Sequence, residues 1–343
     1  MNGHPPIHGI AHCDIAVGNV DTAAETLRRE YGFTDQADVA VRTCADERTL
    51  MLGQGAIRLT VSGATRPGAP AGTFVHQHGE GVRDIGLLVP DPDEAQRLAV
   101  ARGGRATDRT PAWAPAGSRS IEGPGVFTHT FVAAGEPRGE DPAGPLRLLD
   151  HFALAVACGD LESWADFYVT VLGFEVVMKE TTDTGRTSMR SIVVRHPGSR
   201  ITFTIVEPGA PGDRSQINEF VAANGGAGVQ HIAMLTGDIA DTVDRLREAG
   251  VTFLTTPATY YERLHDRVPN LPDPIERLRS RHILVDSDAG GELLQIFTRP
   301  VTGRPTLFFE VIERRHGSSG FGSGNIKALF EAVEADQAGR GVL

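Results

Sequence analysis

The sequence predicts an α+β fold in which four βαβββ modules pair into two domains, each built on an open, cupped sheet. Three observations predict it. Two pairs of matching strings occur in the same order in the two halves of the chain, short β-branched strands accompany one amphipathic helix per module, and a stretch of linker composition separates the halves.

The first matched pair marks the opening strand of one module in each half. His12-Cys-Asp-Ile-Ala-Val near the start matches His151-Phe-Ala-Leu-Ala-Val at mid-chain. Each string leads into an expected helix, Val20–Tyr31 or Leu161–Leu172, and then into Gly-Phe. An apolar strand followed by an amphipathic helix is the start of a βαβββ unit.

The second matched pair opens the other module of each half. Gly79-Glu-Gly-Val-Arg-Asp84-Ile matches Gly226-Ala-Gly-Val-Gln-His231-Ile. The expected helices that follow are Asp93–Arg102 and Ile239–Ala249, and each ends at a glycine. Two matched pairs in the same order indicate one module used four times.

The remaining strands are short and apolar, as in Ile192-Val-Val and Ile201-Thr-Phe-Thr-Ile. Between the halves, AGEPRGEDPAGP has the glycine, proline and charge content of a linker. We therefore expect an N-terminal non-catalytic domain over residues 1–133, a linker over 134–147 and a C-terminal catalytic domain over 148–343.

Two additions distinguish the C-terminal half. Tyr260–Arg281, polar and with three prolines, is inserted between strands. Gly317-Ser-Ser-Gly-Phe-Gly-Ser-Gly is too rich in glycine for a strand, and it precedes a helix with apolar residues at helical spacing from Ile326 to Val333. This helix is expected either to act as a lid over a pocket or simply to pack on the sheet.

Composition excludes several classes of partner. The chain has 343 residues and a net charge of −11, which argues against nucleic acid or an anionic membrane as the main partner. No apolar run approaches the ~20 residues of a membrane span, and the start of the chain does not resemble a secretory signal. Three cysteines without metal or disulfide spacing favour a cytoplasmic protein.

Among twelve histidines, His151 and His231 stand out because each lies inside an apolar strand. Strand alternation places small residues beside each ring, which leaves room for a ligand. His76 and His78 are interpreted as loop residues, and the remaining histidines in polar contexts, such as His196, as solvated. Either strand histidine alone favours a hydrogen-bonded core residue; the pair in equivalent strands of one domain favours a metal site.

Glu310 is the third candidate ligand. Its carboxylate stands in mid-strand in Leu307-Phe-Phe-Glu-Val-Ile, where burial is costly unless a cation compensates. Two histidines and one carboxylate form the facial triad of non-haem iron(II) oxygenases, which leaves three positions open for a 2-oxo acid and O₂. No glycine fingerprint for a nucleotide cofactor accompanies it.

Six longer strings carry a resemblance to a known family. DHFALAV, RSIVV, GGAGVQHIA, LLQIFTRP, RPTLFFEVIER and GFGSGN resemble the 4-hydroxyphenylpyruvate dioxygenase family of the vicinal oxygen chelate superfamily. The resemblance covers the whole chain and is strongest after Leu149. It implies Fe(2+) as the cofactor, with His151, His231 and Glu310 as its ligands and catalytic residues.

The resemblance also implies a substrate pocket. Its expected members are Ser191, Thr204, Val206, Gln216, Gln295, Phe297, Phe308, Phe321 and Ile326. Glutamine amides can bind a phenol or a carboxylate, and phenylalanine faces can hold an aromatic ring, although each phenylalanine could equally be core. In the N-terminal half, His12, Asp84 and a residue near Thr130 match the triad, which leaves a second metal site open.

The family contains two activities on the same substrate, 4-hydroxyphenylpyruvate, and O₂. One gives homogentisate in tyrosine catabolism; the other hydroxylates the benzylic carbon to give 4-hydroxymandelate. Where the dioxygenase pattern has proline, asparagine and phenylalanine, this chain has Thr204, Val206 and Ile326. These residues are similar to those of the 4-hydroxymandelate-forming enzymes, whereas Arg299-Pro300 and Gly320-Phe-Gly322 are shared or resemble the dioxygenase.

The expected function is therefore iron-dependent formation of (S)-4-hydroxymandelate and CO2, feeding 4-hydroxyphenylglycine and antibiotic biosynthesis. Homogentisate formation is the alternative, and a metal-free protein that sequesters a small molecule is a distant one. Small molecules are the expected partners, and a homodimer is left open.

Overall fold

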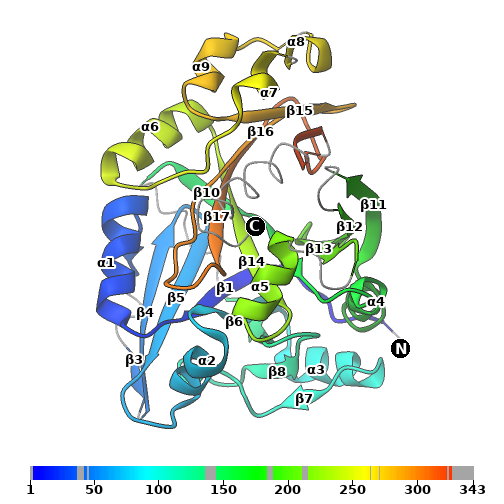
Figure 1. Ribbon diagram of the computed structural model, residues 1–343. Coiled ribbons are helices and arrows are strands. Elements are labelled where there is room, and N and C mark those ends of the chain that lie inside the picture. Colours follow the sequence, from blue (N-terminus) through cyan, green and yellow to red (C-terminus); the bar gives the residue numbers. More distant parts are fainter. Residues whose placement is uncertain are drawn as a thin grey trace.

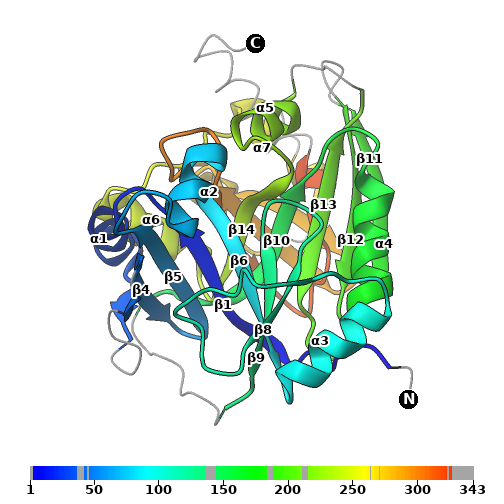
Figure 2. The ribbon, with the colours of Figure 1, turned by 90° about the horizontal axis from the view of Figure 1, so that it is seen from below.

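The computed structural model describes residues 3–36, 42–44, 46–135, 144–183, 188–210, 215–262, 264–269, 271–322 and 324–326. In these ranges two curved sheets lie side by side, and helices cover their outer faces (Figures 1 and 2). The expected α+β architecture of two cupped sheets is confirmed.

The N-terminal sheet runs in the order β2-β4-β5-β1-β6-β9-β8-β7, with β3 paired to β4. Its central strand β1 is parallel to β5 and antiparallel to β6. The strands are β1 Gly9–Ala16, β2 Thr34–Asp35, β3 Arg42–Cys44, β4 Glu47–Gln54, β5 Ile57–Ala64, β6 Gly81–Val89, β7 Ala106–Thr107, β8 Arg119–Glu122 and β9 Thr128–Ala133.

The C-terminal sheet repeats this topology in the order β11-β12-β13-β10-β14-β17-β16-β15. Its central strand β10 is parallel to β13 and antiparallel to β14, as β1 is to β5 and β6. The strands are β10 Leu146–Ala155, β11 Glu175–Asp183, β12 Ser188–Arg195, β13 Thr202–Pro208, β14 Gly228–Thr236, β15 Leu284–Asp288, β16 Gly291–Phe297 and β17 Phe308–Arg314.

One long helix follows the first strand of each module, where the sequence places it. The helices are α1 Val20–Tyr31, α2 Pro70–His78, α3 Pro92–Ala101, α4 Leu161–Leu172, α5 Gln216–Ala223, α6 Ile239–Ala249, α7 Ala258–Glu262, α8 Leu264–Arg267 and α9 Ile275–Arg279. Gly32 and Gly173 end α1 and α4 with φ of 75° and 78°, a conformation that glycine adopts without strain.

An apolar core continues from one half of the molecule into the other. Tyr31 of α1 lies edge-on against Phe309 of β17, with ring centroids 5.1 Å apart. His129 of β9 is buried against Tyr168 of α4 and Phe203 of β13. Burial of large aromatic side chains across this boundary holds the two sheets in a fixed relation.

Two expectations about histidines are wrong. His76 and His78 belong to helix α2, which starts at Pro70 and continues for nine residues, and are not in a loop. His196 has only 7% of its surface exposed and contacts Phe174, so it is a core residue. For His196, polar neighbours in the sequence conceal an apolar neighbour from another part of the chain, Phe174.

The insertion between β14 and β15 contains α7, α8 and α9, and it is less polar than its sequence suggests. Tyr260 and Tyr261 are buried, and their hydroxyls donate hydrogen bonds to the carbonyls of Val285 and Ile283. Within the described residues, no helix is both long and apolar enough to span a membrane.

The chain after β17 forms no strand in its described part. We call Gly317–Gly322 the glycine-rich segment. Gly322 has φ of 72°, and a Cβ atom there would collide with the Gln295 side chain, so the position requires glycine. A helical turn starts at Gly324, and the expected lid helix beyond Ile326 lies outside the described residues.

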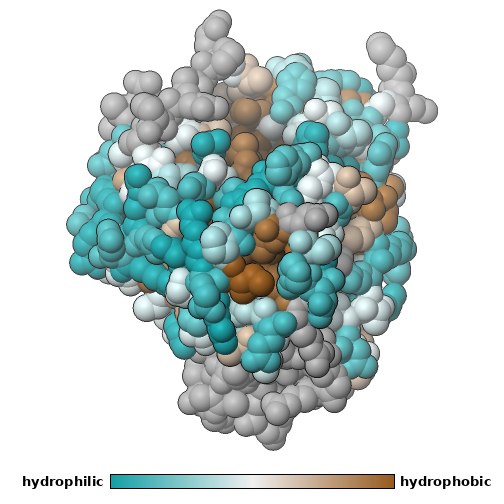
Figure 3. Space-filling view, turned by 90° about the horizontal axis from the view of Figure 1, so that it is seen from above, coloured by the Kyte–Doolittle hydropathy of each residue, from teal (hydrophilic) through white to brown (hydrophobic). Residues whose placement is uncertain are grey.

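Figure 3 shows one face of the molecule, where apolar residues gather in a central hollow ringed by hydrophilic residues.

Candidate metal centre

Three neighbouring strands carry the three expected ligands. β14 pairs with β10 on one side and with β17 on the other. In the register of these strands, Ala233 lies between His151 and Glu310, while His231 lies opposite Ala153. The small alanines leave the space above the sheet to the three longer side chains. The two histidines are thus on adjacent strands of one sheet.

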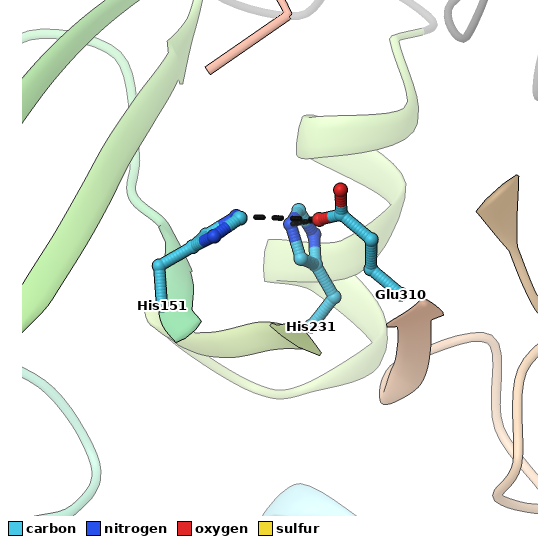
Figure 4. A group of neighbouring side chains, drawn as sticks. All are labelled: His151, His231 and Glu310. Atoms are coloured by element: carbon cyan, nitrogen blue, oxygen red, sulfur yellow. Dashed lines mark ion pairs between the residues drawn. The ribbon is translucent and has the colours of Figure 1, made fainter. Parts of the chain in front are cut away.

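The side chains converge on one point (Figure 4). Nε2 of His151 lies 3.2 Å from Oε2 of Glu310, and Nε2 of His231 lies 3.5 Å from the same oxygen. Among the described residues, these three form the group that could hold a metal, with one ligand atom from each and all ligand atoms within 4.8 Å of one another.

The cluster holds a buried carboxylate between two histidines. Glu310 is 2% exposed, and its ion-pair partners in the described structure are the two histidines. Burial lowers the pKa of His151, but the carboxylates of Glu310 and Asp150 outweigh this and raise it to about 9. Burial lowers the pKa of His231, and the neighbouring His151 contributes. The two carboxylates therefore favour a positive charge at the position of His151.

A divalent metal fits these residues. Two ligand atoms at right angles around an octahedral ion at about 2.1 Å are about 3 Å apart, close to the His151–Glu310 and His231–Glu310 separations. The donor set of two imidazoles and one carboxylate suits iron and related ions. A bound cation would supply the compensation that a buried carboxylate requires.

A pocket opens directly above the three ligands, and all nine expected pocket residues line it. They are Ser191, Thr204, Val206, Gln216, Gln295, Phe297, Phe308, Phe321 and Ile326. Four lining residues were missed by sequence reasoning: Met178, Met189, Ile217 and Gln230. Met189 had a signal, because it lies two residues before Ser191 on the same strand and shares its face.

A β-bulge explains why Gln230 lines the pocket. The pairing of β10 with β14 shifts by one residue between His231 and Val229, which leaves Gln230 as an extra residue. Strict alternation would point the neighbours Gln230 and His231 to opposite faces. The bulge allows both to line the pocket, and one sequence alone gives no sign of it.

The pocket presents buried polar atoms without a protein partner. Ser191 Oγ, Thr204 Oγ1 and Gln295 Oε1 are buried, and the described residues provide no hydrogen bond to any of them. A buried polar atom without a partner costs about 1–3 kcal/mol. A bound molecule with polar groups would satisfy these atoms, so the pocket is suited to a ligand that is aromatic or apolar in part and polar at its ends.

The walls of the pocket differ in character. Phe308 stacks against His231 with ring centroids 4.9 Å apart, and Phe297 is edge-on to the same ring at 5.9 Å. Ile326 belongs to a cluster with Val206, Met189 and Phe220, of which Phe220 does not line the pocket. The pocket therefore has aromatic faces near His231 and an aliphatic wall at the helical turn that starts at Gly324.

In the N-terminal half, the residues at the positions of the three candidate ligands hydrogen-bond to one another. The registers place His12, Asp84 and Thr130 where the other half has His151, His231 and Glu310. His12 Nε2 lies 2.7 Å from Asp84 Oδ2, and the Thr130 hydroxyl donates to Asp84 Oδ1 at 2.7 Å.

In the N-terminal half, the atoms that could bind a metal are hydrogen-bonded to one another, and Thr130 stands where the C-terminal half has the carboxylate of Glu310. The three do not form a group of three metal-ligating side chains, and the described residues give no support to a second metal site here.

Comparison with known proteins agrees with this geometry. Residues 148–274 match the Glyoxalase/Bleomycin resistance protein/Dioxygenase superfamily. The chain is 33% identical to 4-hydroxyphenylpyruvate dioxygenase of Yarrowia lipolytica, covering 98% of this chain and 93% of the relative. It is 35% identical to the enzyme of the same name from Legionella pneumophila strain Corby, covering 91% of each.

A solved structure is similar over almost the whole chain. It is a mutant of 4-hydroxymandelate synthase from Streptomyces coelicolor, 35% identical, with a TM-score of 0.84 over 97% of this chain and 99% of that one. Homologues at this identity and coverage are enzymes, and this chain is related to them from end to end. The chain therefore belongs to the 4-hydroxyphenylpyruvate dioxygenase family, on the two-domain vicinal oxygen chelate fold that it shares with 4-hydroxymandelate synthase.

Proposed function

We propose that the protein is an Fe(II)-dependent 4-hydroxymandelate synthase. It converts 4-hydroxyphenylpyruvate and O₂ into (S)-4-hydroxymandelate and CO2. One oxygen atom is added to the benzylic carbon, and the other enters the carboxylate that forms when the 2-oxo acid loses CO2. The reaction balances without a further reductant, because the 2-oxo acid supplies the electrons.

The observation that carries the choice of product is the aliphatic wall of the pocket. Ile326 lies with Val206 and Met189, while the aromatic faces belong to Phe297 and Phe308 near His231. A substrate ring stacked on one side only is free to tilt. Tilting brings the benzylic carbon, rather than the ring carbon that bears the side chain, nearest to the metal.

The protein's own groups bind and orient the substrate. Ser191, Thr204 and Gln295 offer polar atoms that lack protein partners, and these suit the phenol and the oxo acid. Phe297 and Phe308 hold the ring. The bound iron supplies coordination of the 2-oxo acid and activation of O₂. Burial of the site keeps water away from the reacting groups.

We assign catalysis to the C-terminal domain, residues 148–343, with His151, His231 and Glu310 as iron ligands. The N-terminal domain, residues 1–133, is assigned no catalytic role. Support comes from its triad-equivalent residues, which are satisfied by hydrogen bonds among themselves.

The test of the proposal is product analysis. The purified protein is incubated with Fe(II), ascorbate, O₂ and 4-hydroxyphenylpyruvate, and products are separated by chromatography with chiral detection of mandelate. (S)-4-hydroxymandelate as the main product is expected. Homogentisate as the main product would refute the synthase assignment in favour of the dioxygenase, the activity named for the relatives from Yarrowia and Legionella.

A metal-free sequestering function is disfavoured by Glu310. A protein that only binds a small molecule has no use for a buried carboxylate flanked by two histidines. Metal analysis of protein purified without oxygen and reconstituted with Fe(II) separates the two functions. About one iron per chain is expected, whereas no retained iron with intact ligand binding would favour sequestration.

A further inference from the structure

Asp150 and Arg314 form a buried ion pair directly behind His151. Arg314 donates from Nε and Nη2 to the two carboxylate oxygens of Asp150, each at 2.7 Å. Nδ1 of the His151 ring lies 2.9 Å from Asp150 Oδ1. When Nδ1 donates to that oxygen, the lone pair of Nε2 is left for a metal.

Burial and two-pronged hydrogen bonding fix the geometry of the Asp150–Arg314 ion pair. Only 11% of the Asp150 side chain and 16% of the Arg314 side chain are exposed. A two-pronged contact between guanidinium and carboxylate fixes both groups in one plane, which a single lysine contact does not do.

The half of the molecule without a metal triad also lacks this pair. Ala11, the residue before His12, stands in the place of Asp150, and strands β1 and β10 shift register at the same point. Ala134, four residues beyond the threonine that replaces the glutamate, stands in the place of Arg314. One half of the molecule thus adopts the same fold without this ion pair, so the fold itself does not require the pair.

Arg314 also reaches the glycine-rich segment. Its remaining nitrogen, Nη1, donates to the carbonyl of Gly320 at 2.6 Å. The next residue, Phe321, lies edge-on to the His151 ring with centroids 5.7 Å apart, and the Arg314 guanidinium lies 5.5 Å from its ring centre. One side chain therefore contacts both the support of a metal ligand and the segment that lines the pocket.

We propose that Asp150 and Arg314 are positioning residues that aim His151 at the metal and fix the glycine-rich segment against the pocket. Metal binding and the order of that segment are then coupled, because both depend on the same guanidinium. The proposal rests on the proposed metal site, since it requires His151 to be a ligand.

The first test measures metal binding without turnover. Apoprotein is titrated with Co(II), whose visible absorption reports ligand geometry, for wild type, Asp150→Asn and Arg314→Lys. Loss of an outer partner of a metal-bound histidine typically weakens metal binding about 10–100-fold. We expect a loss in that range for both variants, with altered Co(II) absorption. Arg315→Lys is the matched control, because Arg315 pairs with Glu313 and Asp273 away from the pocket.

The second test measures the coupling. Hydrogen exchange of Gly317–Gly322 amides is followed with and without Zn(II), which binds the same donors but does not turn over. In wild type and in Arg315→Lys, metal is expected to slow exchange in this segment. In Arg314→Lys, the slowing is expected to be largely lost even at saturating Zn(II). Thermal unfolding of the apoproteins identifies any variant that is simply misfolded.

The double variant Asp150→Asn/Arg314→Lys tests whether the two residues act as a unit. A unit predicts a loss of Co(II) affinity close to that of the more damaging single variant, rather than the product of the two. Affinity within twofold of wild type in both single variants would overturn the proposal, as would an equal loss in Arg315→Lys. Unchanged binding in His151→Ala would instead overturn the metal site itself.

Discussion

At the scale of single residues, the candidate site depends on three ligands with no spare among the described residues. We predict that His151→Ala, His231→Ala and Glu310→Ala each abolish turnover and stoichiometric iron binding. Metal content after reconstitution and circular dichroism of the same samples check this. Full iron content in any one folded variant would remove that residue from the set of ligands.

The product is predicted to depend on residue 326. Ile326→Phe adds an aromatic face to the aliphatic wall of the pocket, which is expected to hold the ring flatter and to shift product from 4-hydroxymandelate toward homogentisate. A stacking contact contributes about 0.5–1.5 kcal/mol, and about 1.4 kcal/mol between two barriers changes a product ratio tenfold. Partial redirection with a slower rate is therefore expected. Ile326→Leu, which stays aliphatic, is the control.

Two neighbouring positions test the same idea independently. Thr204 and Val206 lie on β13 with one residue between them, so both face the pocket. Adding Thr204→Pro and Val206→Asn to Ile326→Phe is predicted to increase the share of homogentisate further. Chromatographic product ratios for wild type, single and triple variants measure this. Equal ratios in all of them would mean that these residues do not select the product.

Several residues of the candidate site could be identified from the sequence alone. Glu310 could be found because a carboxylate in an apolar strand is costly, and His151 and His231 because they occupy equivalent strands. Met178 and Gln230 could not be found. Their place in the pocket depends on which strands become neighbours and on a bulge in β14. The alternation of apolar and polar residues along a strand predicts neither of these.

At the scale of elements, helices were easier to predict than the segments between them. The α1, α4 and α6 boundaries follow from helical periodicity and from the glycine that ends each helix. The insertion at Tyr260 was misjudged because its buried hydroxyls pair with a distant strand. The Tyr260 hydroxyl oxygen also lies 2.6 Å from Asn325 Oδ1, so this insertion contacts the residue before Ile326.

Besides Arg314, one carboxylate contacts the glycine-rich segment, that of Asp288. Its Oδ2 accepts hydrogen bonds from the backbone of Ser319 at 2.8 Å and Gly320 at 2.6 Å, and from the Ser318 hydroxyl at 3.0 Å. We predict that Asp288→Ala speeds amide exchange across Ser318–Gly320 and raises the substrate KM several-fold. Co(II) affinity should stay within about twofold of wild type, because Asp288 does not contact a ligand.

The contrast with Asp150 makes this prediction informative. If Asp288→Ala weakened Co(II) binding as much as Asp150→Asn, the glycine-rich segment would control the metal generally. The specific path through Asp150 and Arg314 would then lose its support.

At the scale of the whole molecule, two sheets share one topology, and in the described part of the chain only the C-terminal sheet carries the candidate metal site. Both sheets share strand order, as the repeated strings led us to expect. They also share a bulge before the first histidine, which the strings did not predict. What the repeats could not reveal is how the halves pack. That depends on aromatic side chains such as Tyr168 and Phe309, which look like ordinary core residues in the sequence.

His129 lies at this boundary and gives the last prediction. It is fully buried, its Nε2 is 3.2 Å from the Tyr168 hydroxyl, and burial lowers its pKa to about 4 from 6.5. Above pH 6.5, both folded and unfolded chains hold it neutral. As the pH falls from 6.5 to 4, the unfolded chain takes up the proton first, so folding weakens by about 1.4 kcal/mol per pH unit.

Replacing His129 with a side chain that cannot titrate removes this acid sensitivity. We predict that His129→Gln is no more stable than wild type at pH 7, because a buried amide replaces the ring, yet loses less stability on acidification. Urea unfolding between pH 7 and 4.5 measures the free energy of unfolding for both, with exposed His265→Gln as the control. Because His129 contacts α4 and β13 of the other half, protonation weakens the boundary itself. Parallel pH profiles for wild type and His129→Gln would mean that other groups set the acid limit of the fold.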